Sequence, residues 1–172
     1  MLEFTVEATN KPVKKFIETL MPSMITQLGL TNSRKAVLVK VTNEGLDGVK
    51  GSTSDIAFAD CYLVLIKPPK RMTVPNLTDM ALTLSHEMVH VRQLAKGQLK
   101  SLPKSIRVWM GKKYSKKTKY LDQPWEIDAY GRETGLLTKF AISENLWEIF
   151  TDFVNPAGPI RTHPIAWKNN LK

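Results

Sequence analysis

Three stretches in the first part of the chain have the apolar patterns of β-strands. Polar and apolar residues alternate over residues 2–6, which predicts a short strand with one buried face. Residues 36–41 and 61–66 are mostly apolar, as in buried strands. Closely spaced glycines interrupt the chain between the two, so residues 49–58 are expected to form a hairpin or loop with some strand character.

Apolar residues at steps of three and four predict helices in two longer stretches. Residues 13–28 have this spacing, although Pro22 is expected to kink or interrupt the helix. A second helix is expected over residues 77–96, with Asn76 as its N-cap. Gly97 follows as a left-handed stop. This second helix is apolar on most sides, so we expect it to be buried.

The second helix contains the sequence His86-Glu87-Met88-Val89-His90, an HExxH motif. Residues four apart lie one above the other on a helix, so the two imidazoles can converge on one metal ion. Glu87 lies beside them, where its carboxylate can reach a metal-bound water without being a ligand, as a general base requires. The competing interpretation is a pair of hydrogen-bonded core histidines. It is disfavoured because burying three polar groups together is costly unless something such as a metal satisfies them.

A catalytic zinc site usually has three protein ligands, so a further residue must complete this one. The chain has one more histidine, His163, and a single cysteine, Cys61. A carboxylate is the better candidate, because a third helix is expected to begin at Pro124 and to carry Glu126 in its first turn. Glu126 also has a simpler interpretation as an acid that complements the helix dipole. Asp128 lies two positions further round the helix, where solvent exposure is expected and metal ligation is the less favoured alternative.

The motif followed by Glu126 resembles the gluzincin arrangement of zinc metallopeptidases, in which two helices supply two histidines and a glutamate. Over roughly residues 77–135 the chain is similar to a family of small zincin-like proteins that are common in bacteriophage genomes. The runs that carry this resemblance are residues 85–93, 109–114 and 123–130. The resemblance implies a zincin-like fold in which His86, His90 and Glu126 are the zinc ligands and Glu87 is the base. Asp128 stands where the family usually has a glutamate, which is a conservative difference.

Length and composition fit one compact domain. The chain has 172 residues, of which 42% are apolar, enough to bury a core. We expect an α+β fold over residues 1–154, with a small mixed sheet packed on helices. From residue 155 the composition shifts toward proline, asparagine and other polar residues. Residues 155–172 are therefore expected to be a tail or a segment that wraps the domain.

Several features bear on the location of the protein. No run of about 18 apolar residues occurs, so no membrane span is expected. The first residues lack the basic start and apolar run of a signal peptide. A single cysteine cannot form an internal disulfide, which agrees with folding in a reducing compartment. The expected location is cytoplasmic, including the cytoplasm of an infected bacterium.

Charge is unevenly distributed along the chain, whose formal net charge is +9. From Met88 to Leu121 there are ten lysines and arginines and no acidic residue. This segment joins the helix of the motif to the helix of Glu126, so it must lie near the cleft. We expect Lys100–Lys119 to bind nucleic acid weakly, or to attract an acidic substrate or an anionic assembly surface. The alternative is a solvated lysine-rich loop.

Two functional hypotheses follow. The first is a zinc-dependent peptidase that acts on protein or peptide substrates, in which Glu87 transfers a proton from a zinc-activated water. The residue that stabilises the oxyanion is expected to be Tyr130, one turn beyond Glu126, with Tyr120 and His163 as alternatives. The second hypothesis is a nucleic-acid-binding or virion-assembly protein whose metal site is structural or inactive.

Overall fold

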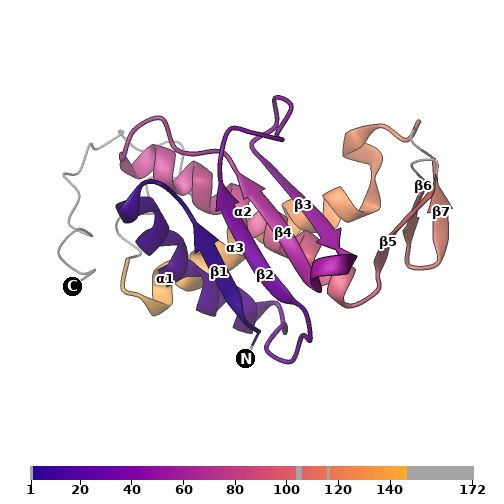
Figure 1. The fold of residues 1–172 in the computed structure, drawn as a ribbon, viewed down its shortest axis with the longest axis horizontal. Helices are drawn as coiled ribbons and strands as arrows, with labels where there is room; N and C mark the ends of the chain where they lie inside the picture. The colour runs from indigo at the N-terminus through magenta and orange to yellow at the C-terminus, as the bar shows by residue number, and fades with distance from the viewer. Residues whose placement is uncertain (1, 104–105, 116, 147–172) are drawn as a thin grey trace.

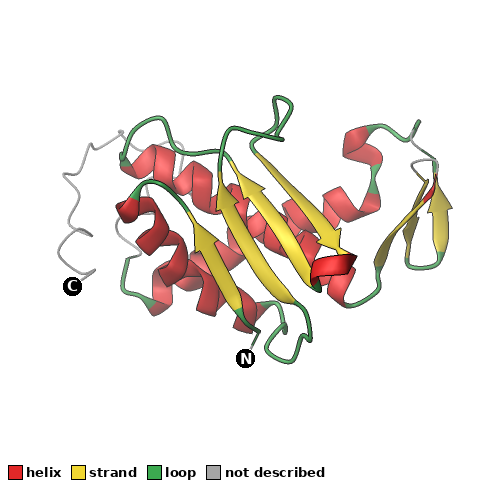
Figure 2. Cartoon of the chain, viewed as in Figure 1, coloured by secondary structure: helices red, strands yellow, loops and turns green. Residues whose placement is uncertain are grey.

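A computed structural model of the chain describes residues 2–103, 106–115 and 117–146. This part contains two β-sheets and three α-helices, so the expected α+β class is confirmed (Figure 2). The expected boundary between residues 154 and 155 lies outside the described residues, as do the segment 155–172 and His163.

The larger sheet contains four strands, whose bounds and spatial order are β1 (Phe4–Glu7), β2 (Ala36–Val41), β4 (Cys61–Ile66) and β3 (Gly51–Ile56). The first three are parallel to one another, whereas β3 is antiparallel to β4 and forms an edge. The two strands expected at residues 36–41 and 61–66 are therefore confirmed. The stretch 49–58 supplies the partner strand of a hairpin with β4.

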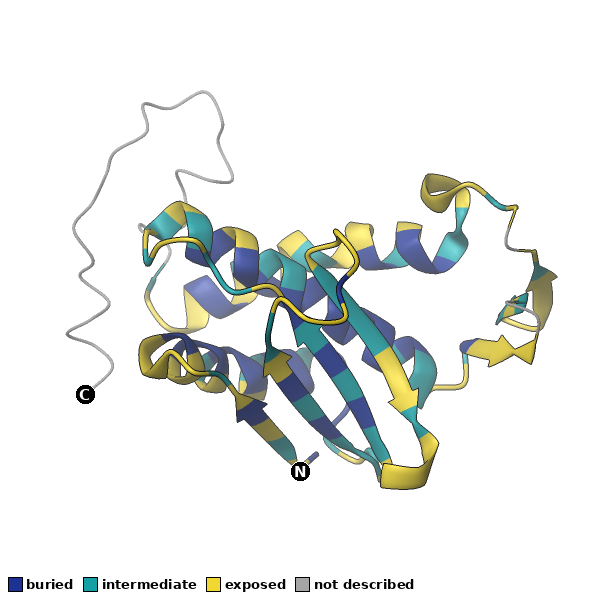
Figure 3. Cartoon of the chain, turned by 45° about the horizontal axis from the view of Figure 1, so that its top comes forward, coloured by how far each residue is buried: buried dark blue, intermediate teal, exposed yellow. Residues whose placement is uncertain are grey.

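Three helices cover one face of this sheet, with the bounds α1 (Lys11–Gln27), α2 (Val74–Ala95) and α3 (Pro124–Ser143) (Figure 1). Buried and less buried residues alternate along the central strands (Figure 3). Val39 and Val64 are fully buried and belong to the core that also contains the helix side chains. α2 packs against β3 and β4 and also against α3, so its side chains meet both. Among the described helices, none has the length and apolar character needed to cross a membrane.

Two helix details differ from the sequence-based expectation. α1 continues through Pro22 without interruption. Pro22 has no N–H group, so the carbonyl of Glu18 lacks its helical hydrogen bond. Both residues lie on the exposed face of the helix, where water can replace this bond. α2 begins before Asn76, because Pro75 is compatible with the first turn of a helix. The Asn76 amide is not an N-cap and donates to the carbonyl of Arg71 at 3.1 Å.

The basic segment forms a second, three-stranded antiparallel sheet that projects from one end of the molecule (Figure 1). Its strands are β5 (Leu99–Leu102), β6 (Ile106–Trp109) and β7 (Lys112–Tyr114). Met110 and Gly111 connect the last two with φ angles of 48° and 85°, the left-handed conformation of tight hairpin turns. The described part of the segment thus contains a sheet and is not a loop throughout.

Candidate metal centre

α2 brings the two histidines of the motif together. His86 and His90 lie one turn apart, and their Nε2 atoms are 3.2 Å from each other. Only 7% and 9% of their respective surfaces are exposed. The two Nε2 atoms therefore point to one common place inside the protein, as the HExxH spacing predicts.

Glu126 reaches the same place from the first turn of α3. Its Oε2 atom lies 3.1 Å from Nε2 of His86 and 3.4 Å from Nε2 of His90. One ligand atom from each of the three side chains lies within 4.8 Å of the other two. The three buried residues form a cluster that can hold a metal ion, and two imidazole nitrogens with one carboxylate oxygen are a donor set that suits zinc.

The other ring nitrogens of the two histidines are also held. Nδ1 of His86 donates to Oε2 of Glu133 at 2.9 Å, and Nδ1 of His90 donates to Oε1 of Gln93 at 2.8 Å. Such bonds to the far nitrogen orient each ring and leave the Nε2 lone pair available for a metal. Both rings are therefore preorganised as ligands.

Gln93 links the cluster to α3. Its side chain is fully buried, and its Nε2 atom donates to the carbonyl of Trp125 at 2.9 Å and to the carboxylate of Asp128 at 3.0 Å. Asp128 also accepts a hydrogen bond from Arg132 at 2.7 Å. The expectation that Asp128 is solvent-exposed is therefore wrong. Asp128 is half-buried, because it accepts a hydrogen bond from the Gln93 amide, which in turn positions His90.

Sequence reasoning missed three residues that support the site. Glu133 lies seven residues after Glu126, and Gln93 lies three after His90, so each shares a helical face with the residue of the cluster that precedes it. That spacing is a signal that could have indicated both. Thr53 gave no such signal, because it belongs to a strand distant in sequence from the motif.

Glu87 lies against the edge strand β3. Its Oε2 atom accepts a hydrogen bond from Oγ1 of Thr53 at 2.7 Å. A Cβ atom at Gly51 would lie 2.8 Å from Cγ of Glu87, so only glycine allows the strand to approach this closely. Burial raises the pKa of the Glu87 carboxyl, although His90 and the Thr53 hydrogen bond act against this. A raised pKa suits a group that must take up and release a proton near neutral pH.

Charge pairing shifts the pKa values of the cluster. Burial acts to lower the pKa of His86, but hydrogen bonds to Glu126 and Glu133 outweigh it and raise this pKa to about 9. Burial acts to raise the pKa of Glu126, yet its hydrogen bonds to His86 and His90 hold it well below the usual range. Protons and a metal ion compete for the same nitrogen lone pairs, so metal binding strengthens as the pH rises.

A cleft of about 660 Å³ gives access to the cluster and to Glu87. The Tyr130 ring lies edge-on to the His86 ring, with centroids 4.6 Å apart. The ring centroids of Tyr120 and Tyr130 are 6.4 Å apart. Both tyrosines line the cleft and are about half exposed. Burial, together with hydrogen bonding to Glu126, raises the pKa of Tyr120 above its usual value, so its hydroxyl stays protonated.

Comparison of this chain with protein-family models, with curated proteins and with solved structures gave no match. Three kinds of group line one cleft: a cluster of atoms that could hold a metal ion, a buried carboxylate outside that cluster, and tyrosine hydroxyls. Together they can bind a cation, accept a proton and donate a hydrogen bond to a developing negative charge.

Proposed function

We propose that this chain is a zinc-dependent peptidase with a zincin-like fold, in which His86, His90 and Glu126 hold the ion. The observation that carries the proposal is the convergence of these three side chains, from two helices, beside an open cleft. Support comes from Glu133 and Gln93, which hold the far nitrogens of the two histidines in the way that metal ligands are commonly held.

Glu87 is the proposed general base. Bound zinc supplies Lewis acidity, which lowers the pKa of water at the site toward neutrality. Glu87 accepts a proton from the attacking water and passes it to the leaving amine, while Thr53 keeps its carboxylate in place. The hydroxyl of Tyr130 donates to the carbonyl oxygen of the scissile bond as negative charge develops there, with Tyr120 as the alternative donor.

The proposed substrates are extended segments of protein or peptide. Residues Gly51, Ser52 and Thr53 of β3 line the cleft, and β3 is an edge strand of its sheet. An edge strand has unpaired main-chain N–H and C=O groups, which an extended peptide can pair with as an added strand. A peptide bound in this way passes beside Glu87 and the metal-binding atoms.

The protein purified without added metal is expected to contain about one zinc ion per chain, because three preorganised ligands hold zinc tightly. It should cleave an unfolded protein such as casein. Removing the metal with a chelator should abolish cleavage, and stoichiometric zinc should restore it. Elemental analysis and the appearance of cleavage products in the same samples measure the two quantities.

The Glu87→Gln protein, prepared in parallel, controls for contaminating host peptidases. Cleavage that persists unchanged after the metal has been removed would contradict the proposal. So would a protein that binds no zinc at neutral pH.

A second candidate function, nucleic-acid binding with a structural or inactive metal site, is supported by one feature of the small sheet. Cross-strand pairing sets Lys100, Val108 and Lys113 in one row, so both ammonium groups lie on the same face. No acidic residue occurs in the surrounding segment. Phosphate groups of DNA or RNA can be attracted by such a surface without sequence preference.

Weak, sequence-independent binding of duplex and single-stranded DNA is therefore expected, with a steep loss of affinity between about 50 mM and 200 mM salt. Lys100→Glu combined with Lys113→Glu should lower the affinity and the salt dependence, as measured by fluorescence anisotropy. Lys112→Glu, compared with Lys113→Glu alone, is the charge-matched control, because Lys112 lies over the ring of Tyr114 on the opposite face. An absence of binding even at low salt would rule this candidate out.

A further inference from the structure

Charged side chains of both signs line the cleft, and most of them are bonded within the protein. Lys50 forms an ion pair with Asp79, with Nζ and Oδ1 2.6 Å apart. The acids around the histidines are bonded to imidazoles, and the general base is bonded to a threonine. Arg107 also lines the cleft, yet it forms no ion pair with any carboxylate of the described residues.

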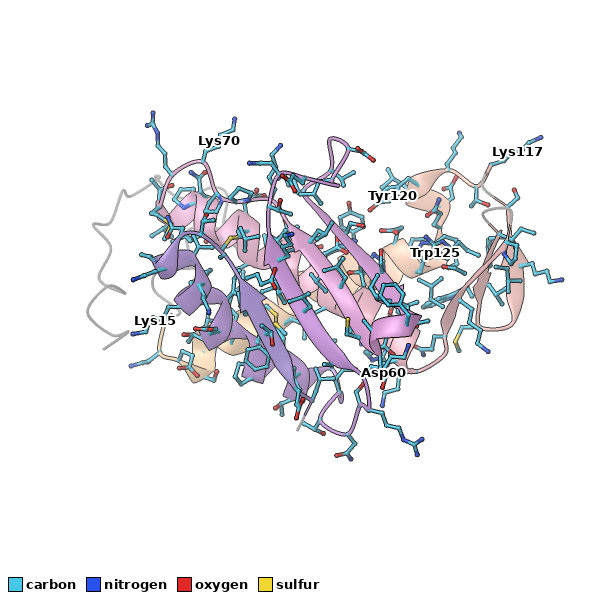
Figure 4. The ribbon with its side chains drawn as sticks, in the orientation of Figure 1. Lys15, Asp60, Lys70, Lys117, Tyr120 and Trp125 are labelled. Atoms are coloured by element: carbon cyan, nitrogen blue, oxygen red, sulfur yellow. The ribbon has the colours of Figure 1, made fainter. Side chains whose placement is uncertain are left out.

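The small sheet turns Arg107 toward the cleft. Cross-strand pairing sets Ser101, Arg107 and Tyr114 in one row, on the same face as Leu99, which lines the cleft. The hydroxyl of Ser101 accepts a hydrogen bond from Nη1 of Arg107. Tyr114 packs edge-on against Trp125, with ring centroids 5.6 Å apart. Figure 4 shows Trp125 in the space between the two sheets.

The surroundings of Arg107 favour binding of a carboxylate. A guanidinium group has five N–H donors in a planar fork that matches the two oxygens of a carboxylate, and Ser101 takes only one of these donors. The apolar side chains of Leu94, Leu99 and Trp125 line the same cleft. Arg107 is exposed in the free protein, and a ligand seated against these apolar side chains would cover part of it, which strengthens a charge-assisted hydrogen bond.

We propose that Arg107, with Leu94, Leu99 and Trp125, forms a subsite that binds a carboxylate of the substrate. This inference rests on the peptidase function proposed above and deepens it: the preferred substrates are peptides with a negative charge close to the scissile bond. The carboxylate belongs either to an aspartate or glutamate side chain or to the C-terminus of the peptide, since the guanidinium fork matches both.

A series of peptides of equal length tests the subsite. One glutamate is moved stepwise through a neutral background, and each peptide is made with a free and with an amidated C-terminus. For one glutamate position, or for the free C-terminus, kcat/KM should exceed that of the matched glutamine or amide peptide by about tenfold or more. The position dependence and the effect of amidation distinguish the two sources of the carboxylate.

Substitutions of Arg107 should change this preference through KM. Arg107→Gln should remove the advantage of the acidic peptide, and Arg107→Lys should retain part of it. Arg107→Glu should transfer the advantage to a peptide that carries lysine in place of the glutamate. Arg71→Gln is the matched control, since both guanidinium groups are exposed but Arg71 lies outside the residues that line the cleft. A general loss of folding would lower the cleavage of all peptides alike and could not invert their order.

Binding of the same labelled peptides to the Glu87→Gln protein separates the subsite from catalysis. Preferential binding of acidic peptides that depends on Arg107, without cleavage by the wild type, would keep the subsite and overturn the peptidase. Cleavage with the same preference in wild type and Arg107→Gln would keep the peptidase and overturn the subsite. An effect of Arg107→Gln on oligonucleotide binding alone would overturn the subsite in favour of a phosphate contact.

Discussion

Glu126→Ala is expected to lose its bound zinc, because the two remaining histidines are too few to hold the ion tightly. The metal content should fall from about one zinc per chain to nearly none after dialysis, as measured by elemental analysis. The melting temperature should also fall, since metal binding couples to folding. Adding zinc should raise the melting temperature of the wild type and leave that of the variant almost unchanged.

Two further variants test whether this loss is specific to Glu126. Asp128→Ala should keep nearly all of its zinc, because Gln93 retains the Trp125 carbonyl as an acceptor. His163→Ala should also keep it. If His163→Ala empties the site while Glu126→Ala does not, the ligand set is three histidines, and the segment that contains His163 completes it.

Glu87→Gln is expected to retain about one zinc per chain and to lose peptidase activity by at least about two orders of magnitude. The amide has the shape of the carboxylate, and its oxygen can still accept the hydrogen bond from Thr53. It cannot take a proton from water near neutral pH. The metal content of the variant should therefore stay near that of the wild type while kcat/KM falls, both measured on the same preparation.

Asp79→Asn is a matched control for this loss. It converts another carboxylate of the cleft to an amide, but one that pairs with Lys50 and does not contact the histidines in the described structure. It should leave kcat close to the wild-type value. Equal cleavage by wild type and Glu87→Gln would show that Glu87 is not the base.

Part of the fold and of the site follows from local sequence. The HExxH spacing places His86 and His90 on one face of any helix, and this holds whatever the helix packs against. Gly97 ends α2 with a φ of 66°, a conformation that glycine adopts without strain. Pro124 opens α3, so Glu126 falls in the first turn. Apolar runs were sufficient to predict β2 and β4 because both strands are central in their sheet.

The small β5–β7 sheet was not predictable in this way. Its strands have only three or four residues, too few for an alternating pattern to be distinguished from a loop. Only their pairing determines which side chains share a face. It places Arg107 on the side of the cleft and Lys100 on the other side, although the two residues look alike as members of one basic segment.

The sequence by itself determined the paired histidines, the adjacent glutamate and the helices that carry them, because helical periodicity depends on local geometry alone. The tertiary structure decided which other groups meet them. Glu126 is 40 residues from His86, and Thr53 is 34 residues from Glu87. Contacts over such separations depend on how α3 and β3 pack against α2, and no local pattern in the sequence encodes that packing.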